Sequence, residues 1–159
     1  MVFTGTYEHA IDAKNRLAIP AEIRAQVHAE PGRQAGGPIV FQVTAGEGQS
    51  LYLYTEAAFQ QRAEELLNSD AETDQLLTYE RLWFSMARRI EMDSAGRIRI
   101  ADSLLKRARL GGEVVLLGVN DHLEVRDRRT WQEYVDQILT EQPQILVNPR
   151  RVTRPGRRS

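Results

Sequence analysis

Two stretches of the 159-residue chain repeat one pattern, Asp12-Ala-Lys-Asn-Arg16-Leu-Ala-Ile19 and Asp93-Ser-Ala-Gly-Arg97-Ile-Arg-Ile100, and this pattern decides the fold. They lie 81 positions apart and share an Asp, an Arg four residues later and two apolar residues at alternate positions. Such alternation is typical of a strand with one buried face. Each stretch therefore predicts a tight turn followed by a strand, and the chain is predicted to hold two copies of one unit.

A second repeated stretch extends each copy towards its carboxyl end. Leu51 to Phe59 matches Leu123 to Trp131 at a separation of 72 positions. The smaller separation fits an insertion in the first copy near residues 28–38, where Pro and Gly gather. Each copy is thus predicted as strand, tight turn, strand, short helix, hairpin and amphipathic helix. We expect Gly111 to close the second short helix.

The expected fold class is α+β, with two tandem units related by a pseudo-twofold axis within one chain. We place the first unit at residues 1–70, a helical connector at 71–85 and the second unit at 86–142. Residues 143–159 contain five Arg and no acidic residue. We expect this basic tail to be disordered, as chain ends without buried contacts commonly are.

The composition excludes several classes of protein. With 21 basic and 22 acidic residues the net charge is −1, so bulk charge does not drive binding to nucleic acid or to an anionic membrane. The chain has no Cys, which excludes disulfide scaffolds, thiolate zinc sites and cysteine nucleophiles. The longest strongly apolar run, Val114 to Val119, is far shorter than the roughly 20 residues that span a bilayer. We expect a cytoplasmic protein without a membrane segment.

Motifs for catalysis or for cofactor binding are not found. None of the three His residues has a carboxylate or a second His at metal-ligand helical spacing. The Gly-rich segment 45–50 lacks the Lys-Ser/Thr ending of a phosphate-binding loop and is interpreted as a hairpin loop. We therefore predict no catalytic residues, no metal site, no cofactor and no small-molecule substrate.

The repeated Asp-x-x-x-Arg motif is the remaining candidate for function. Its Asp can accept backbone N–H bonds and stabilise the turn, and Asn15 or Gly96 tolerates the left-handed conformation that such a turn needs. The Arg then lies at the start of the return strand, near the Asp. A purely structural interpretation stays open, in which a turn-capping Asp pairs with a surface Arg. Recurrence in both copies, and Lys14 beside Arg16, favour a binding role.

These motifs resemble the MraZ family of bacterial transcriptional regulators, which are built from two tandem AbrB-like (SpoVT-AbrB) units. The resemblance rests on residues 5–20, Asp93 to Ile100 and Val114 to Val125, and it extends over about residues 1–142. It implies swapped-hairpin β-barrel repeats with short flanking helices that pair inside one chain. It also implies a nucleoid-associated, ring-shaped homo-oligomer that binds double-stranded DNA at repeated promoter boxes of the division and cell-wall gene cluster, usually as a repressor.

The resemblance also assigns site residues. By motif, the family's Asp-x-x-x-Arg pairs are Asp12 with Arg16 and Asp93 with Arg97, and we assign both Asp residues to stabilising the turns. The residues expected to contact DNA are Lys14, Asn15, Arg16, Arg97 and Arg99.

Three departures from the family pattern make the two copies unequal. Asn15 stands where the family has a typical Gly, and the left-handed conformation remains accessible to Asn. Ala95 occupies the position of Lys14 in the second copy. Ala101 and Asp102 replace a usual Pro. We therefore expect the stronger DNA contact from the first copy.

Two other classes of function remain to be weighed against DNA binding. An AbrB-like antitoxin or scaffold would chiefly bind a protein partner, but such chains generally carry one copy, so the two-copy chain argues against it. A pyruvoyl-dependent decarboxylase on a related barrel needs a self-cleaving Gly-Ser pair, and the sequence has no Gly-Ser dipeptide.

Overall fold

The computed structural model describes residues 1–69 and 73–147. The end of the first predicted unit, the start of the predicted connector and the predicted basic tail beyond residue 147 lie outside the described residues. By its internal contacts the chain divides into two compact units, Met1–Arg128 and Arg129–Ser159. Over the described ranges, no helix combines the length and apolar character needed to cross a membrane.

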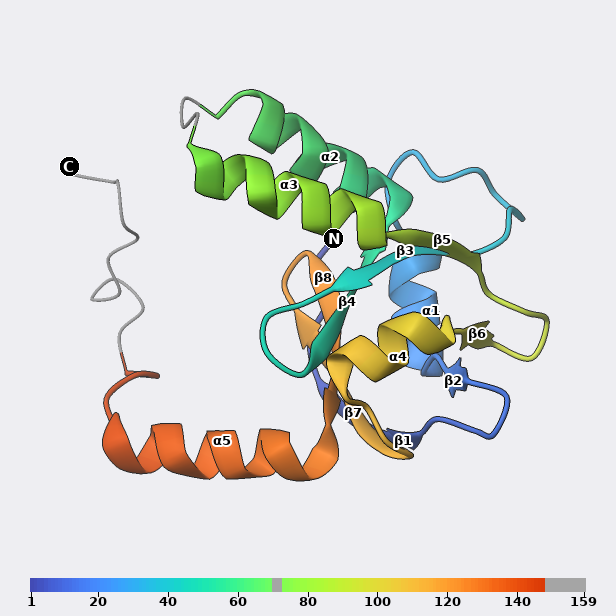
Figure 1. Ribbon diagram of the computed structural model, residues 1–159. Coiled ribbons are helices and arrows are strands. Elements are labelled where there is room, and N and C mark those ends of the chain that lie inside the picture. The colour runs from blue at the N-terminus through green and yellow to red at the C-terminus, as the bar shows by residue number, and fades with distance from the viewer. Residues whose placement is uncertain (70–72, 148–159) are drawn as a thin grey trace. The chain divides into compact units, whose positions relative to one another are not determined.

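The described residues form an α+β fold, as the sequence predicts, and the elements follow the predicted order in both copies (Figure 1). The first copy contains β1 (Thr6–Ala10), β2 (Arg16–Ala18), α1 (Ala21–His28), β3 (Val40–Ala45), β4 (Ser50–Thr55) and α2 (Glu56–Leu67). The second copy is preceded by α3 (Asp74–Met86). It contains β5 (Arg88–Glu91), β6 (Arg97–Arg99), α4 (Asp102–Ala108), β7 (Glu113–Val119), β8 (His122–Asp127) and α5 (Arg128–Glu141).

The strands of the two copies are interleaved. An antiparallel sheet has the strand order β1-β7-β8-β4-β3-β5, and β2 pairs with β6 in a second sheet. The first strand of each copy lies against the hairpin of the other, because β1 pairs with β7 and β5 pairs with β3. Leu17 of β2 faces Ile98 of β6, its equivalent in the repeat. Equivalent elements of the two copies therefore make equivalent contacts, as a pseudo-twofold relation between the copies requires.

One hydrophobic core serves both copies. It includes Leu17, Ile98, Ile23 of α1 and Leu104 of α4, all almost fully buried, together with residues of β3, β4, β7 and β8. Burying an aliphatic side chain of this size contributes about 1.5–3 kcal/mol. Because each copy supplies strands that complete the other's sheet, neither copy closes this core alone.

The end of α4 differs from the sequence-based expectation. Arg109 caps the helix with φ of 53°, in the left-handed conformation, and its N–H donates to the carbonyl of Lys106 at 3.1 Å. Gly111 does not have positive φ, so the prediction that it closes the helix is wrong. A left-handed C-cap normally favours Gly, but the geometry tolerates other residues at a cost of roughly 1–2 kcal/mol.

Candidate nucleic-acid interface

The turn between β1 and β2 has the hydrogen bonds that the sequence predicts. Asp12 Oδ1 accepts from the backbone N–H of Lys14 and of Arg16, both at 2.9 Å. Asp12 Oδ2 accepts from Nε of Arg16 at 2.8 Å. Asn15 has φ of 61°, the left-handed conformation expected of it. One carboxylate thus closes the turn and orients the Arg side chain at the same time.

The turn between β5 and β6 repeats this arrangement almost atom for atom. Asp93 Oδ1 accepts from the N–H of Ala95 and of Arg97 at 2.9 Å, and Oδ2 accepts from Nε of Arg97 at 3.1 Å. Gly96 takes the place of Asn15, with φ of 78°. In both turns only Nε of the Arg is used, so within the described residues the two Nη groups have no hydrogen-bond partner.

The two turns lie beside each other because each is bonded to the other copy. Ile19 N–H donates to the carbonyl of Gly96 at 2.9 Å, and Ile100 N–H donates to the carbonyl of Asn15 at 2.8 Å. Figure 1 shows both turns projecting from the same side of the first compact unit, beyond β2 and β6. The arrangement presents two oriented guanidinium groups on one surface.

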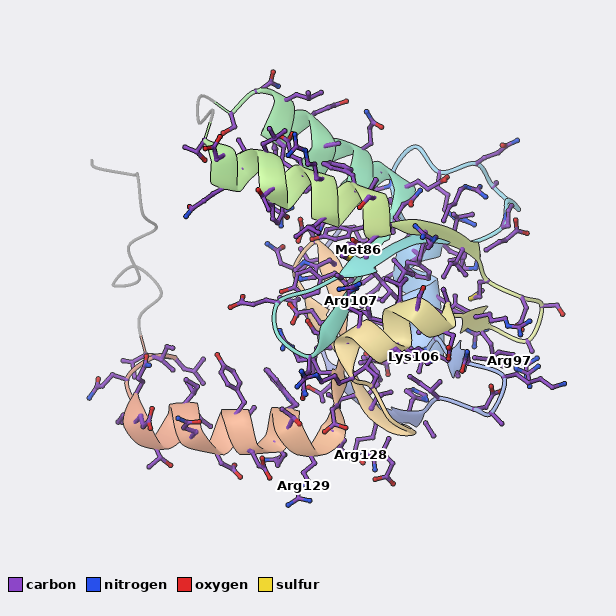
Figure 2. The ribbon with its side chains drawn as sticks, viewed as in Figure 1. Met86, Arg97, Lys106, Arg107, Arg128 and Arg129 are labelled. Carbon is purple, nitrogen blue, oxygen red and sulfur yellow. The ribbon has the colours of Figure 1, made fainter. Side chains whose placement is uncertain are left out.

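The charges around the two turns are unequal. In the β2–β6 ladder Arg16 faces Arg99, whereas Arg97 faces Ala18. Lys14 and Arg99 are exposed, so the first turn gathers three cations from both copies. The second turn has Arg97, labelled in Figure 2, as its outward cation.

The helices beside the turns also differ. Asp102, the first residue of α4, pairs with Lys106 at 2.9 Å, which lowers the pKa of its carboxyl, and the Asn15 side chain adds to this effect. The second turn instead lies against α1, where a β-carbon built on Gly96 would come within 3.1 Å of Nη1 of Arg24. Nε of Arg24 is buried without a hydrogen-bond partner. Arg24 is therefore packed against the second turn and does not extend its outer surface.

The carboxyl groups of both turns remain ionised at neutral pH. The backbone N–H of Arg16 is the main cause that lowers the pKa of Asp12 below its ordinary value of 3.8, and the Arg16 side chain adds to the effect. The N–H and side chain of Arg97 lower the pKa of Asp93 in the same way. Because the Asp in each turn is charged, its carboxylate binds Nε of the Arg and holds that side chain in one orientation.

Comparison with known families decides the assignment. The family described as MraZ protein, antitoxin-like, matches residues 2–79 and again residues 83–154. The chain belongs to the MraZ family. The two consecutive matches confirm the two tandem repeats that the sequence indicates. MraZ membership fits a transcriptional regulator or an antitoxin-like protein, and MraZ is a regulator-type family.

The structure places the seven predicted site residues in the two turns and on β6. The first turn holds Asp12, Lys14, Asn15 and Arg16, and the second holds Asp93 and Arg97. Arg99 lies beside the first turn, because it faces Arg16 in the β2–β6 ladder. The sequence alone did not predict that Arg99 would join the turn of the other copy, because this pairing depends on strand exchange.

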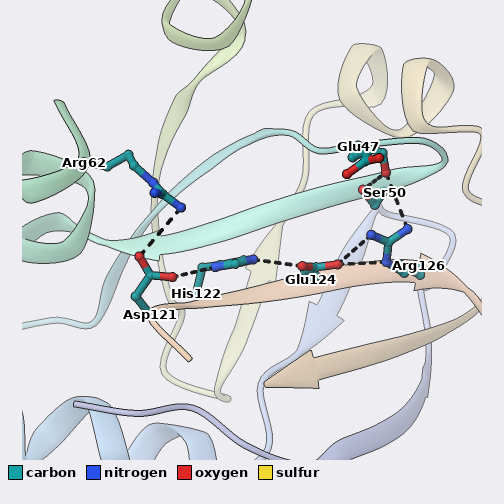
Figure 3. A network of polar contacts seen from close by, with 7 residues as sticks. All are labelled: Glu47, Ser50, Arg62, Asp121, His122, Glu124 and Arg126. Atoms are coloured by element: carbon teal, nitrogen blue, oxygen red, sulfur yellow. Dashed lines mark hydrogen bonds and ion pairs between the residues drawn. The ribbon is translucent and has the colours of Figure 1, made fainter. Parts of the chain in front are cut away.

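A buried polar network, which the sequence reasoning missed, lies on β8 (Figure 3). His122 Nδ1 contacts Asp121 at 2.8 Å, and Nε2 contacts Glu124 at 2.9 Å. Arg126 donates to Glu124 through Nε at 2.8 Å, and Arg62 of α2 reaches Asp121 at 3.9 Å. The signal was the alternation of His122, Glu124 and Arg126, since residues two apart on a strand share one face.

The network favours a charged His. Burial lowers the pKa of His122, but the hydrogen bonds to Glu124 and Asp121 outweigh burial and raise the pKa above 6.5. Burial raises the pKa of Glu124, and the hydrogen bonds from His122 and Arg126 more than reverse this. With both ring nitrogens against carboxylates, each donates only in the imidazolium form. Within the described residues no cluster of His, Asp or Glu has the arrangement of a metal site.

Proposed function

We propose that this chain is a sequence-specific DNA-binding transcriptional regulator, acting as a repressor of the division and cell-wall gene cluster. The observation that carries the proposal is the pair of adjacent Asp-x-x-x-Arg turns, each holding its Arg by Nε alone. A guanidinium oriented in this way can bind the O6 and N7 atoms of guanine with its two Nη groups, or contact phosphates in two directions.

A single chain has few such groups. Lys14, Arg16, Arg97 and Arg99 are the cations of the two turns, and each phosphate that they neutralise contributes a salt slope of about −0.9. One chain should therefore bind weakly at physiological salt. A ring-shaped homo-oligomer that engages repeated promoter boxes multiplies the affinity through effective concentration. The near-neutral net charge is compatible with this mode, because affinity then depends on assembly.

The fold supports the finer parts of the proposal. Exchange of first strands between copies is the pairing expected of swapped-hairpin β-barrel repeats. We assign the chain to that architecture, and a crystal structure of the oligomer would test the closure of the barrel. Mapping bound genomic DNA would test the target, since enrichment at repeated boxes before a cell-wall gene cluster is expected on the nucleoid.

Arg16→Ala is the direct test of DNA binding. We expect it to abolish box-specific binding in a mobility-shift titration while light scattering shows an unchanged oligomer. Arg81→Ala is the matched control, because Arg81 is an exposed Arg of α3 outside both turns. Binding by Arg16→Ala equal to that of Arg81→Ala would reject the assignment.

A second candidate is an antitoxin-like protein that chiefly binds a protein partner. The description of the matching family supports it. It predicts that the chain co-purifies with one specific protein at a fixed ratio and does not shift promoter DNA. The paired cationic turns favour the DNA-binding proposal, since a protein partner requires no such repeated arrangement.

A further inference from the structure

The network on β8 is a line of charged side chains whose signs alternate (Figure 3). Arg62 of α2 lies at one end of the line and Arg126 at the other. Between them, one ring nitrogen of His122 contacts Asp121 and the other contacts Glu124. Each carboxylate therefore lies between two cations. Of the cations, only His changes its charge near neutral pH.

The ring of His122 is held in one orientation. It stacks on Tyr54 at a centroid distance of 5.2 Å, and its centroid lies 4.7 Å from that of Tyr52. Burial raises the pKa of Tyr54 to about 12 and also raises the pKa of Tyr52, so both phenols stay neutral while the imidazole titrates. The buried ring therefore keeps facing both carboxylates with or without its extra proton.

Three other elements bring titratable or charged groups close to this ring. Glu47, in the loop between β3 and β4, accepts through its backbone carbonyl from Arg126 at 3.4 Å. Arg62 of α2 also reaches Glu65 of the same helix at 3.7 Å. Burial raises the pKa of Tyr79 of α3, so this phenol is neutral too. The imidazole is thus the variable charge in these surroundings.

Loss of the imidazolium proton leaves one N–H for two carboxylates. Glu124 is 7% exposed, and a buried carboxylate is costly to leave without a donor, so the remaining N–H stays on Glu124. The Asp121 side chain is 46% exposed and has a second cation, Arg62, at 3.9 Å. Asp121 is therefore the carboxylate that separates from the ring.

Asp121 belongs to the two-residue turn between β7 and β8. Its neighbour Asn120 has φ of 61°, a left-handed conformation that is less favourable for Asn than for Gly and depends on surrounding contacts. The backbone of Asn120 exchanges two hydrogen bonds with Phe3, at 2.7 and 3.1 Å. Phe3 is buried and precedes β1. The contact between Asp121 and His122 thus supports the turn that holds the amino-terminal segment.

We propose that His122 is a proton-dependent switch that controls the β7–β8 turn. With its proton, the ring binds the Asp121 carboxylate and the turn holds Phe3 firmly. Without it, the carboxylate moves to Arg62 of α2 and the turn holds Phe3 less firmly. Because the pKa of His122 is raised above 6.5 in the folded chain, the contact contributes fully below about pH 6.5 and is lost as the pH rises through the raised pKa. The inference does not depend on the proposed DNA contact.

The first experiment uses the unmodified chain. Nitrogen NMR should show both ring nitrogens of His122 protonated below pH 6.5, with a titration midpoint above 6.5. Amide hydrogen exchange, corrected for the pH dependence of the intrinsic rate, should show that protection of the Phe3 and Asn120 amides falls several-fold through this midpoint. The amide of Ile19, which donates to Gly96 in the paired turns, is the internal control and should show no such change.

Two variants distinguish a switch from a passive contact. His122→Gln supplies one donor and one acceptor at every pH, as the neutral ring does, so both amides should be weakly protected throughout, without a step. Arg62→Gln removes the second cation, so Asp121 stays with the ring and the midpoint of His122 should rise. Arg81→Gln is the matched control, because Arg81 is an exposed Arg of α3 outside the network, and it should leave the midpoint unchanged.

Three outcomes would overturn the inference. A midpoint of His122 at or below 6.5 would mean that the ring is neutral between its carboxylates. Protection of Phe3 and Asn120 that stays constant while His122 titrates would mean that the proton does not act on the turn. Equal midpoints in Arg62→Gln and Arg81→Gln would mean that Asp121 is not shared between two cations. Each result is obtained without DNA, so the regulator stands or falls on Arg16→Ala alone.

Discussion

The turn at Asp12–Arg16 and the turn at Asp93–Arg97 have the same hydrogen bonds and different surroundings. In both, one carboxylate accepts two backbone N–H groups and holds the Nε of the Arg. The first turn adds Lys14 and receives Arg99 from the other copy, whereas the second has Ala95 and faces Ala18. The shared geometry defines where each Arg side chain points, and the unequal neighbours give the first turn more positive charge than the second.

This difference predicts that substitutions in the two turns affect different properties, DNA affinity in one case and stability in the other. The second turn keeps its hydrogen bonds although it lacks the extra cations, so the motif supports the fold independently of the DNA contact that we propose. We therefore expect substitutions in the first turn to change mainly the affinity for DNA. Substitutions that alter the backbone of the second turn should change mainly the free energy of unfolding.

The largest expected effect comes from the two motif arginines. One bidentate Arg–base contact is worth about 1–3 kcal/mol, which is about 5- to 150-fold per site, and several subunits multiply it. We expect Arg16→Ala to weaken box binding at least 100-fold and Arg97→Ala about tenfold, as measured by fluorescence anisotropy at constant salt. Equal losses would show that the turns contribute alike, and the comparison above would fail.

The next largest effect concerns backbone conformation. Gly96→Ala places a β-carbon at φ of 78°, where a left-handed residue with a side chain costs about 1–2 kcal/mol. Asn15→Gly, the reciprocal change at the equivalent position, should alter the free energy of unfolding by only a few tenths of a kcal/mol, because the relief of φ at 61° offsets the loss of the Asn15 side chain beside Asp102. Urea denaturation of both variants measures the contrast, which a destabilising Asn15→Gly would contradict.

A smaller effect is expected from equalising the charges. Ala95→Lys gives the second turn the cation that Lys14 supplies in the first. If it reaches a phosphate, the slope of log affinity against log salt should steepen by about 0.9 for each turn engaged. The affinity at low salt should rise a few-fold. Lys14→Ala should shift the slope the opposite way, and a slope that neither variant changes would place both positions outside the interface.

The smallest effect is a pH dependence shared by the turns. The pKa of Asp12 and of Asp93 is lowered from 3.8 in the folded chain. Their contribution to stability is therefore complete above about pH 3.8 and is lost as the pH falls through the lowered folded pKa. Carboxyl carbon NMR titration should give both residues midpoints below 3.8, and Arg16→Ala should raise only that of Asp12.

The repeat made much of this architecture predictable. The order of elements, the two turns and the pairing of Asp with Arg follow from local patterns, because alternation and turn residues act over a few neighbours in the chain. The left-handed cap at Arg109 was not predictable from local sequence, since Gly111 offered the stronger signal two residues later. The His122 network was also missed, because carboxylates near a His in sequence do not reveal burial.

By itself, then, the sequence determined that two similar units exist and which Asp and Arg form each turn, because those contacts span four residues. Only the tertiary structure decided which strands of the two units pair, that Arg99 faces Arg16 and that Arg97 faces Ala18. The physical reason is register. β2 and β6 are 81 positions apart, and their register is fixed because Leu17 and Ile98 are both buried opposite each other. This register sets which residue each neighbouring Arg faces.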